Sequence, residues 1–151
     1  MGDVGRPNFY HTGDEAMTEV AVELLRERGV DEVVLVASSP ALATQLYGCP
    51  GVPRIRFSKK WTRERCEQRL AALDDELASQ SPLDGSSREV IDAVSVADAL
   101  LIAGGGNLRS EHRYMIYERL ALVRVARHFG VPVCVTSQTV GPMLEPADEA
   151  L

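Results

Sequence analysis

The chain has 151 residues and a mass of 16.5 kDa, which is the size of one ordinary domain. Hydrophobic residues make up 45% of it and charged residues 25%, values that are typical of a folded globular domain and exclude disorder throughout. The net charge of −6 opposes nonspecific binding to nucleic acid or anionic membranes, and no stretch approaches the roughly 20 apolar residues that span a bilayer.

The N-terminus and the cysteines indicate the cellular compartment. Residues 1–6 lack a basic segment followed by a long apolar run, so no secretory signal is recognised. Cys49, Cys66 and Cys134 are scattered and fit neither a disulfide framework nor zinc spacing. Cys66 falls on an apolar helical face and Cys134 inside an apolar strand, so both thiols are expected to be buried. We expect a cytoplasmic protein without a metal site.

Apolar runs alternate with amphipathic helical patterns along the chain, which is typical of βαβ units with parallel strands. The expected strands are residues 1–4, 32–38, 52–57, 99–103 and 131–136. The expected helices are residues 14–28, 40–47, 62–79, 89–97 and 111–128, with a loop at 81–87. The buried face of the first helix should be Met17, Val20, Ala21, Leu24 and Leu25, and that of the third Cys66, Leu70, Leu73 and Leu77.

Right-handed crossovers and short connections favour a doubly wound, Rossmann-like parallel sheet of about five strands in the order 3-2-1-4-5. In that order the first and fourth strands are neighbours at the point where the winding reverses. The loops that follow them, residues 5–13 and 104–110, then flank one crevice at the carboxyl edge of the sheet, where α/β proteins bind ligands. We expect residues 1–151 to form this single domain.

The turn Thr12-Gly13-Asp14-Glu15 has two interpretations. It has the form of a capping box, with Thr12 as the N-cap and Glu15 at the third helical position, and Asp14 also gains from the helix dipole. Alternatively, its carboxylates accept hydrogen bonds from a ligand. Because two carboxylates repel phosphate, the ligand favoured at this helix end is a polyol or a carbohydrate.

Gly2, Gly5 and Gly13 lack the G-x-G-x-x-G spacing of a dinucleotide site, so NAD is disfavoured and no cofactor is expected. His11 lies in the same first loop. An imidazole there suits general-base activation of a hydroxyl group, although a single loop histidine is more often simply exposed.

A second unusual segment follows the fourth predicted strand and comprises Gly104, Gly105, Gly106 and Asn107. One glycine is explained by a turn, whereas three in succession indicate backbone that a ligand or a neighbouring loop approaches closely. Arg109, His112 and Arg113 come next and form either an anion-binding cluster or a solvated first helical turn, which Ser110 can cap.

Gln138 ends the fifth predicted strand at the same edge of the sheet. Its amide can donate and accept, which suits recognition of hydroxyl groups, or it can cap loop backbone. Farther back, Lys59, Lys60 and Arg63–Arg65 are predicted to form a solvated basic face. Trp61 beside them either packs against the helix or offers a stacking surface.

Four segments carry a likeness to a known family, and they occur in the family's order: residues 11–16 (HTGDEA), 97–106 (ADALLIAGGG), 130–133 (GVPV) and 137–143 (SQTVGPM). They resemble the N-x-G-D-E-A, G-G-G-plus-acid and Q-G-x-G-P-L motifs of the polysaccharide pyruvyl transferase family. Nearly the whole chain is covered. Four residues depart from the motifs: His11 replaces Asn, Glu111 replaces Asp, and Ser137 and Thr139 replace glycines.

The resemblance implies one half of a two-domain, glycosyltransferase-B-like architecture with the active site between two Rossmann-like halves. It implies that the chain is the N-terminal half, that the donor-binding domain is absent from it, and that it is inactive by itself. Phosphoenolpyruvate would be held mainly by the second half. The first half would supply the acceptor side for transfer of pyruvate, as a ketal, to hydroxyls of a bacterial cell-surface saccharide.

Under this interpretation Asp14 orients the acceptor hydroxyl and His11 is the second catalytic candidate. The substrate-binding candidates are Gly13, Glu15, Gly104, Gly105, Gly106, Asn107, Arg109 and Gln138. Two other functions stay open, namely a non-catalytic small-molecule-binding α/β domain and half of a sugar-nucleotide glycosyltransferase. An apolar face left exposed by a missing second half would favour a homo-oligomer.

Overall fold

The structure is a computed structural model that describes residues 12–79, 85–142 and 144–151. Its helices are α1 (Thr12–Glu27), α2 (Pro40–Tyr47), α3 (Arg63–Ser79), α4 (Gly85–Ser95), α5 (Arg113–His128) and α6 (Pro146–Glu149), with a 3₁₀ turn at Ser110–His112. Its strands are β1 (Leu35–Ala37), β2 (Gly51–Pro53), β3 (Leu100–Ile102), β4 (Gly105–Leu108), β5 (Val133–Val135) and β6 (Gln138–Val140). No helix among these residues is long and apolar enough to cross a bilayer.

The strands form three parallel pairs, β1 with β2, β3 with β5, and β4 with β6. The α/β class is therefore confirmed, as are two predicted neighbour relations, between the second and third strands and between the fourth and fifth. The predicted first strand, residues 1–4, lies outside the described residues. The five-strand order 3-2-1-4-5 thus stays a prediction.

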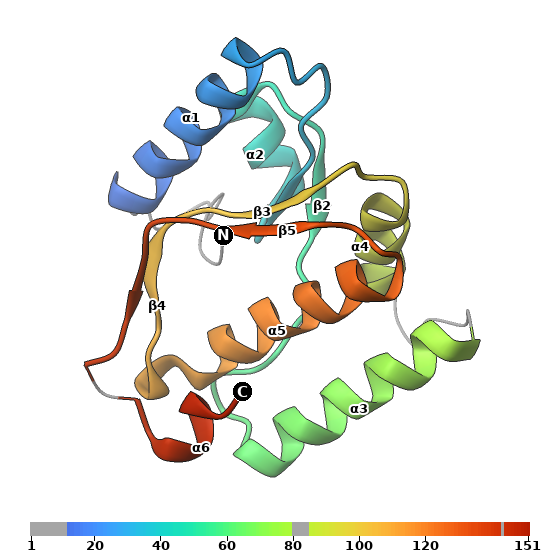
Figure 1. The fold of residues 1–151 in the computed structure, drawn as a ribbon, viewed down its shortest axis with the longest axis vertical. Coiled ribbons are helices and arrows are strands. Elements are labelled where there is room, and N and C mark those ends of the chain that lie inside the picture. The colour runs from blue at the N-terminus through green and yellow to red at the C-terminus, as the bar shows by residue number, and fades with distance from the viewer. Residues whose placement is uncertain (1–11, 80–84, 143) are drawn as a thin grey trace.

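Helices cover the strands from two sides (Figure 1). Helices α1 and α2 lie on one side of β3 and β5, whereas α4 and α5 lie on the other, with α3 packed along the outer side of α5. Val36 of β1 and Ile102 of β3 border one small cavity together with Leu122 of α5. Both strand pairs therefore meet over α5.

The hydrophobic core lies between α3, α4, α5 and the strands, and its centre is Tyr117 of α5, which has no exposed surface. Phe57 stacks on the Tyr117 ring at a centroid distance of 5.8 Å. The predicted buried face of the third helix is confirmed, and its members are Cys66, Leu70, Leu73 and Leu77. Such a continuous apolar stripe fixes which face of α3 turns inward.

Helix α1 is rotated relative to the prediction. Val20 and Leu24 are 52% and 50% exposed, whereas Glu15, Thr18 and Val22 are buried. The Glu15 carboxylate accepts a hydrogen bond from the Tyr47 hydroxyl at the end of α2. The prediction is therefore wrong for Val20 and Leu24, whereas Met17, Ala21 and Leu25 are half-buried, and the buried face of α1 also includes polar residues with tertiary or local partners.

The prediction of buried cysteines is confirmed for Cys66 and wrong for Cys134, which is exposed on β5. Val135 beside it is also exposed, since among the described strands β5 pairs only with β3. An apolar run therefore indicated a strand correctly but not how deeply it is buried.

Helix α2 packs against β1 and β2 through a close backbone approach. A Cβ atom on Gly51 would lie 2.7 Å from the carbonyl oxygen of Pro40, which is far inside van der Waals contact. Glycine at position 51 thus lets the first turn of α2 sit directly on β2.

The C-terminal segment is held by ion pairs at the N-terminal ends of α3 and α5. Arg63 binds Glu145 at 3.0 Å and also pairs with Asp148, and Arg113 binds Glu145 at 2.9 Å and Asp148 at 3.4 Å. The Ser110 hydroxyl accepts a hydrogen bond from the Glu145 amide at 2.7 Å rather than capping the helix. The prediction of a solvated face is therefore wrong for Arg63, because the tail supplies carboxylates.

The Asp148 side chain is wholly buried in this cluster. Burial by itself would raise the pKa of Asp148, but hydrogen bonds from Ser110 and Arg63 and the charges of Arg63 and Arg113 outweigh it, so the pKa lies below its usual 3.8. A depressed carboxyl pKa stabilises the folded state above the unfolded pKa, and this contribution is lost as pH falls through the folded pKa.

We expect Asp148→Asn to lower the free energy of unfolding near neutral pH by about 3 kcal/mol, because two arginines lose a buried carboxylate partner. Below about pH 4 the deficit should shrink as the wild-type carboxyl takes up its proton. Urea unfolding at both pH values measures this. The exposed neighbour Glu149, changed to Gln, is the control and should unfold like the wild type. A deficit that is independent of pH would contradict the assignment.

Candidate functional site

Two neighbouring strands bend together near one end of the molecule (Figure 1). After β3 the chain turns at Gly104 and continues as β4, and after β5 it turns at Ser137 and continues as β6. Gly105 and Gln138 are register partners, and the Gly105 amide donates to the Ser137 carbonyl at 3.2 Å. Two predictions need correction, because Gly105 and Gly106 belong to a strand rather than a loop and Gln138 begins a strand rather than ending one.

Gly104 lies at the bend, where α1 approaches it closely. A Cβ atom at this position would lie 2.5 Å from the Met17 sulfur of α1 and 3.4 Å from the Ser137 Cβ. Ser137 itself adopts a left-handed backbone with φ of 54°. The first turns of α1 therefore lie directly against the glycine segment and its partner strand.

A different physical reason explains the presence of glycine at each of positions 104, 105 and 106. Gly104 is explained by the neighbouring α1 and Ser137 segments. Gly105 has φ of 139°, which a residue with a side chain rarely adopts. Gly106 is exposed, and a Cβ there would meet no atom within 4 Å. Packing accounts for Gly104 and backbone conformation for Gly105, whereas Gly106 faces open space that a ligand can enter.

Asp14 lies in the first turn of α1, close in sequence to Met17. Its side chain is half-buried and forms no hydrogen bond or ion pair with a described residue, while its carbonyl accepts from the Thr18 hydroxyl at 2.7 Å. The helix begins at Thr12, so Thr12 is not the N-cap that the capping-box interpretation requires. His11, the second catalytic candidate, lies outside the described residues.

Glu15 and Gln138 differ in whether their side-chain oxygens have a hydrogen-bond partner. The Glu15 carboxylate is buried against the Tyr47 hydroxyl, so it has a structural partner. The Gln138 Oε1 atom is shielded from solvent and accepts no hydrogen bond from any described residue. A buried acceptor without a donor is costly, and a ligand hydroxyl is one group that would satisfy it.

The basic cluster after the glycines is mostly paired internally. Arg109 donates to Glu111 at 2.5 Å, and Arg113 is held by Glu145 and Asp148. Two buried nitrogens in this cluster, Arg109 Nε and His112 Nδ1, lack partners among the described residues. The cluster therefore has less free positive charge than its sequence indicates. Nothing is described of the Asn107 side chain.

A second concave feature lies beyond the ends of β1 and β2, and the sequence analysis missed most of it. The pocket has a volume of about 360 Å³ and is lined by Ser38, Arg54, Arg56, Phe57, Ser58 and Trp61. The signal that could have revealed it is the Arg-x-Arg spacing of Arg54 and Arg56 directly after an apolar strand, which places two guanidinium groups at a carboxyl strand end.

No group of three or more histidine, cysteine or acidic side chains suited to a metal occurs among the described residues. The polysaccharide pyruvyl transferase family model matches residues 11–150. The chain belongs to this family. Membership identifies a transferase lineage and implies a saccharide acceptor, and the matched range includes Asp14, the glycine segment and Gln138. No curated protein and no solved structure is significantly similar to this pyruvyl transferase family member.

We expect Gly104→Ala to destabilise the fold by about 1 kcal/mol, because the new methyl group must displace the Met17 sulfur, which lies on a flexible side chain, and also approaches Ser137 at 3.4 Å. Gly106→Ala is the matched control and should be nearly neutral, since the same methyl group meets open space. Thermal or urea unfolding measures both.

A double-mutant cycle tests the contact itself. Met17→Ala removes the colliding sulfur, so the loss in the Met17→Ala/Gly104→Ala double variant should be smaller than the sum of the two single losses, by about 1 kcal/mol. Additive losses would contradict the close approach of α1 to Gly104.

Proposed function

We propose that the chain supplies the saccharide-acceptor side of a polysaccharide pyruvyl transferase that uses phosphoenolpyruvate as donor. The observation that carries the proposal is the family match over residues 11–150. Its proposed location rests on the approach of Met17 in α1 to Gly104, because Asp14 lies one helical turn before Met17 and Gly106 lies two residues after Gly104.

The reaction requires two acceptor hydroxyls on one saccharide. A proton adds to the methylene carbon of phosphoenolpyruvate, and the first hydroxyl oxygen bonds to the central carbon. The carbon–oxygen bond to phosphate then breaks, and its electron pair leaves with the phosphate. The second hydroxyl bonds to the same carbon and closes the ketal. Of the two hydroxyl protons, one balances the proton taken by the methylene and the other leaves with the phosphate.

Asp14 is proposed to orient the attacking hydroxyl. Its carboxylate is half-buried and unpaired among the described residues, so it can accept a hydrogen bond from an acceptor hydroxyl. A carboxylate that accepts this hydrogen bond can also take up the hydroxyl proton as a general base, which makes the attacking oxygen more nucleophilic. Glu15 is a weaker candidate, because Tyr47 already binds its carboxylate.

The Gln138 side chain and the Gly106 backbone are proposed to complete the acceptor surface. The Gln138 oxygen offers a shielded acceptor for a second hydroxyl, and the exposed strand at Gly106 allows a sugar ring to approach main-chain atoms. His11, Gly13, Asn107 and Arg109 stay substrate-site candidates from the sequence. The cationic ligands of the donor phosphate are proposed to lie in a second, donor-binding domain.

We expect Asp14→Ala to reduce pyruvyl transfer by about 100-fold or more in the full-length protein that the gene encodes, because the attacking hydroxyl loses its orienting carboxylate. The free energy of unfolding should change by no more than about 1 kcal/mol. Phosphate release and ketal formation are measured together with urea unfolding. Glu19→Gln, an exposed carboxylate on the same helix, is the control. Activity within a few-fold of wild type would leave Asp14 a structural residue only.

The donor separates the proposed function from its alternatives. We expect phosphoenolpyruvate, and not nucleotide sugars, to bind the full-length protein and to be consumed when a saccharide with two free hydroxyls is present. Calorimetric titration and phosphate assay measure this. Binding of nucleotide sugars instead would favour a glycosyltransferase, and saccharide binding without any turnover would favour a non-catalytic domain.

A further inference from the structure

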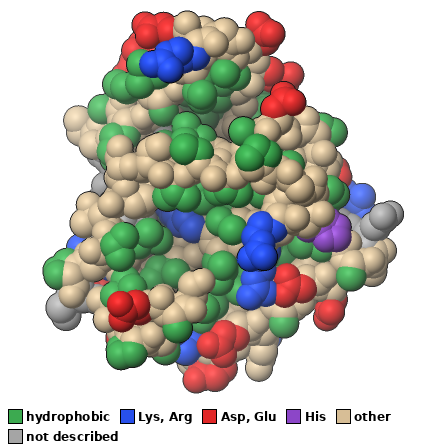
Figure 2. Space-filling view, in the orientation of Figure 1, with side chains coloured by type: hydrophobic (Ala, Val, Ile, Leu, Met, Phe, Trp, Pro, Cys, Tyr) green, Lys and Arg blue, Asp and Glu red, His purple; other side chains and the backbone are tan. Residues whose placement is uncertain are grey.

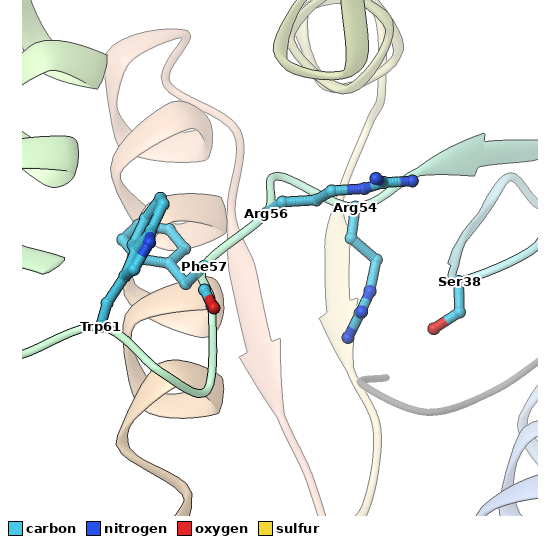
Figure 3. Close-up of a pocket in the computed structure, with 6 residues that line it drawn as sticks. Ser38, Arg54, Arg56, Phe57 and Trp61 are labelled. Carbon is cyan, nitrogen blue, oxygen red and sulfur yellow. The ribbon is translucent and has the colours of Figure 1, made fainter.

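The pocket beyond β1 and β2 is not used by the proposed chemistry, yet two arginines and two serines line it. Figure 3 shows Phe57 and Trp61 at one end, Ser38 at the other, and the Arg54 and Arg56 side chains between them. The volume of about 360 Å³ exceeds what an inorganic anion needs and is sufficient for a sugar ring with a charged substituent.

The Arg54 guanidinium group in this pocket is held in position by a carboxylate of α5. Arg54 donates to Glu118 of α5 at 3.2 Å, and Glu118 lies 3.6 Å from Arg119. Glu118 and Arg119 are both buried. A guanidinium group held by a buried carboxylate has a fixed position at the wall of the pocket, and a guanidinium group is suited to binding a planar or tetrahedral oxyanion.

Arg56 adds a second positive charge, which is not paired with any described carboxylate. It is exposed and forms no hydrogen bond or ion pair with a described residue. On the opposite wall, the Ser38 hydroxyl is shielded from solvent and has no partner among the described residues. An unpaired cation and an unpaired buried hydroxyl in one cavity point to an anionic guest with several oxygens.

The aromatic end of the pocket indicates that the guest is more than a free anion. Trp61 meets Phe57 edge to face at 6.0 Å, and Arg65 lies over the Trp61 ring at 5.5 Å. The indole is only half-buried. Exposed indole surface next to fixed polar groups is suited to the apolar C–H face of a sugar ring.

The surrounding surface makes the charge of the pocket distinctive. The chain has a net charge of −6, and acidic side chains gather at the two ends of the face in Figure 2, over α1 and near α6. A basic pocket in an acidic protein attracts an anion locally without promoting nonspecific binding to polyanions.

We infer that this pocket binds an oxyanion, phosphate or carboxylate, carried on a ring of the acceptor saccharide, so that the preferred acceptor is an anionic sugar. Arg54 and Arg56 bind the oxyanion, Ser38 donates its hydroxyl to it, and Trp61 contacts the ring. The inference rests on the proposed function for its substrate class. The aromatic wall favours a sugar over phosphoenolpyruvate, which has no ring.

The chain contains a single tryptophan, so Trp61 fluorescence, excited selectively over tyrosine, reports on this pocket directly. The titrants are glucose 1-phosphate, glucuronate, neutral glucose, inorganic phosphate and phosphoenolpyruvate at millimolar concentrations. We expect at least one anionic sugar to change the emission saturably and glucose to leave it unchanged. Inorganic phosphate should bind more weakly than the sugar phosphate, and added salt should weaken binding.

The variants test which arginine is responsible. Arg56→Ala should weaken binding of the anionic sugar at least tenfold, and Arg56→Lys should retain part of it. Arg127→Ala, another exposed arginine without a described partner, is the matched control and should bind like the wild type. Circular dichroism and urea unfolding check that each variant is folded.

Several outcomes would overturn the inference. They are no response to either anionic sugar, an equal response to glucose, affinity for inorganic phosphate equal to that for the sugar phosphate, or unchanged affinity in Arg56→Ala. Tightest binding of phosphoenolpyruvate, lost in Arg56→Ala, would assign the pocket to the donor instead. Pyruvyl transfer that is insensitive to Arg56→Ala would refute the inference and leave the proposed function standing. Binding of an anionic sugar detected by Trp61, without any pyruvyl transfer, would support the pocket assignment and refute the proposed function.

Discussion

The arrangement depends on one close approach, in which the Met17 side chain of α1 lies against the backbone of Gly104. A side chain at position 104 would occupy the space of the Met17 sulfur and crowd Ser137. Its absence lets α1 reach the bend where β3 becomes β4 and β5 becomes β6. Met17 lies one helical turn after Asp14, and Gly104 directly precedes the Gly105–Gln138 strand pair. The small size of residue 104 thus allows the Met17 side chain to pack directly on the backbone at the bend.

In the glycine segment, the fold explains some glycines, whereas a neighbouring glycine is free to contact a ligand. Gly104 and Gly105 satisfy packing and backbone geometry, and Gly106 has open space around it. The carboxylates divide in the same way, because Glu15 is bound by Tyr47 while Asp14 has no described partner. Groups that the fold leaves unsatisfied are the ones on which the proposed acceptor site relies. The family match fixes the class of reaction, and these unsatisfied groups suggest where the acceptor lies.

The sequence predicted the element types and two strand neighbours because apolar periodicity and short crossovers are local properties. It did not predict that Glu15 of α1 is buried while Val20 and Leu24 are exposed, since the Glu15–Tyr47 contact joins residues 32 positions apart and leaves no local pattern. It also ended the fourth strand at the glycines, because glycine usually interrupts a strand. The pocket at Arg54 was missed for a related reason, because an alternating Arg pair resembles an ordinary strand until α5 is seen beneath it.

Helix α2 connects the two halves of the surface that the substrate would contact. Its first turn packs against the backbone of Gly51 in β2, and the chain reaches Arg54 of the pocket directly after this strand. Its last residue, Tyr47, holds Glu15 beside Asp14. One eight-residue helix therefore supports both the strand that leads into the arginine pocket and the helical turn that carries Asp14, so the two proposed contact regions for the saccharide share a single structural support.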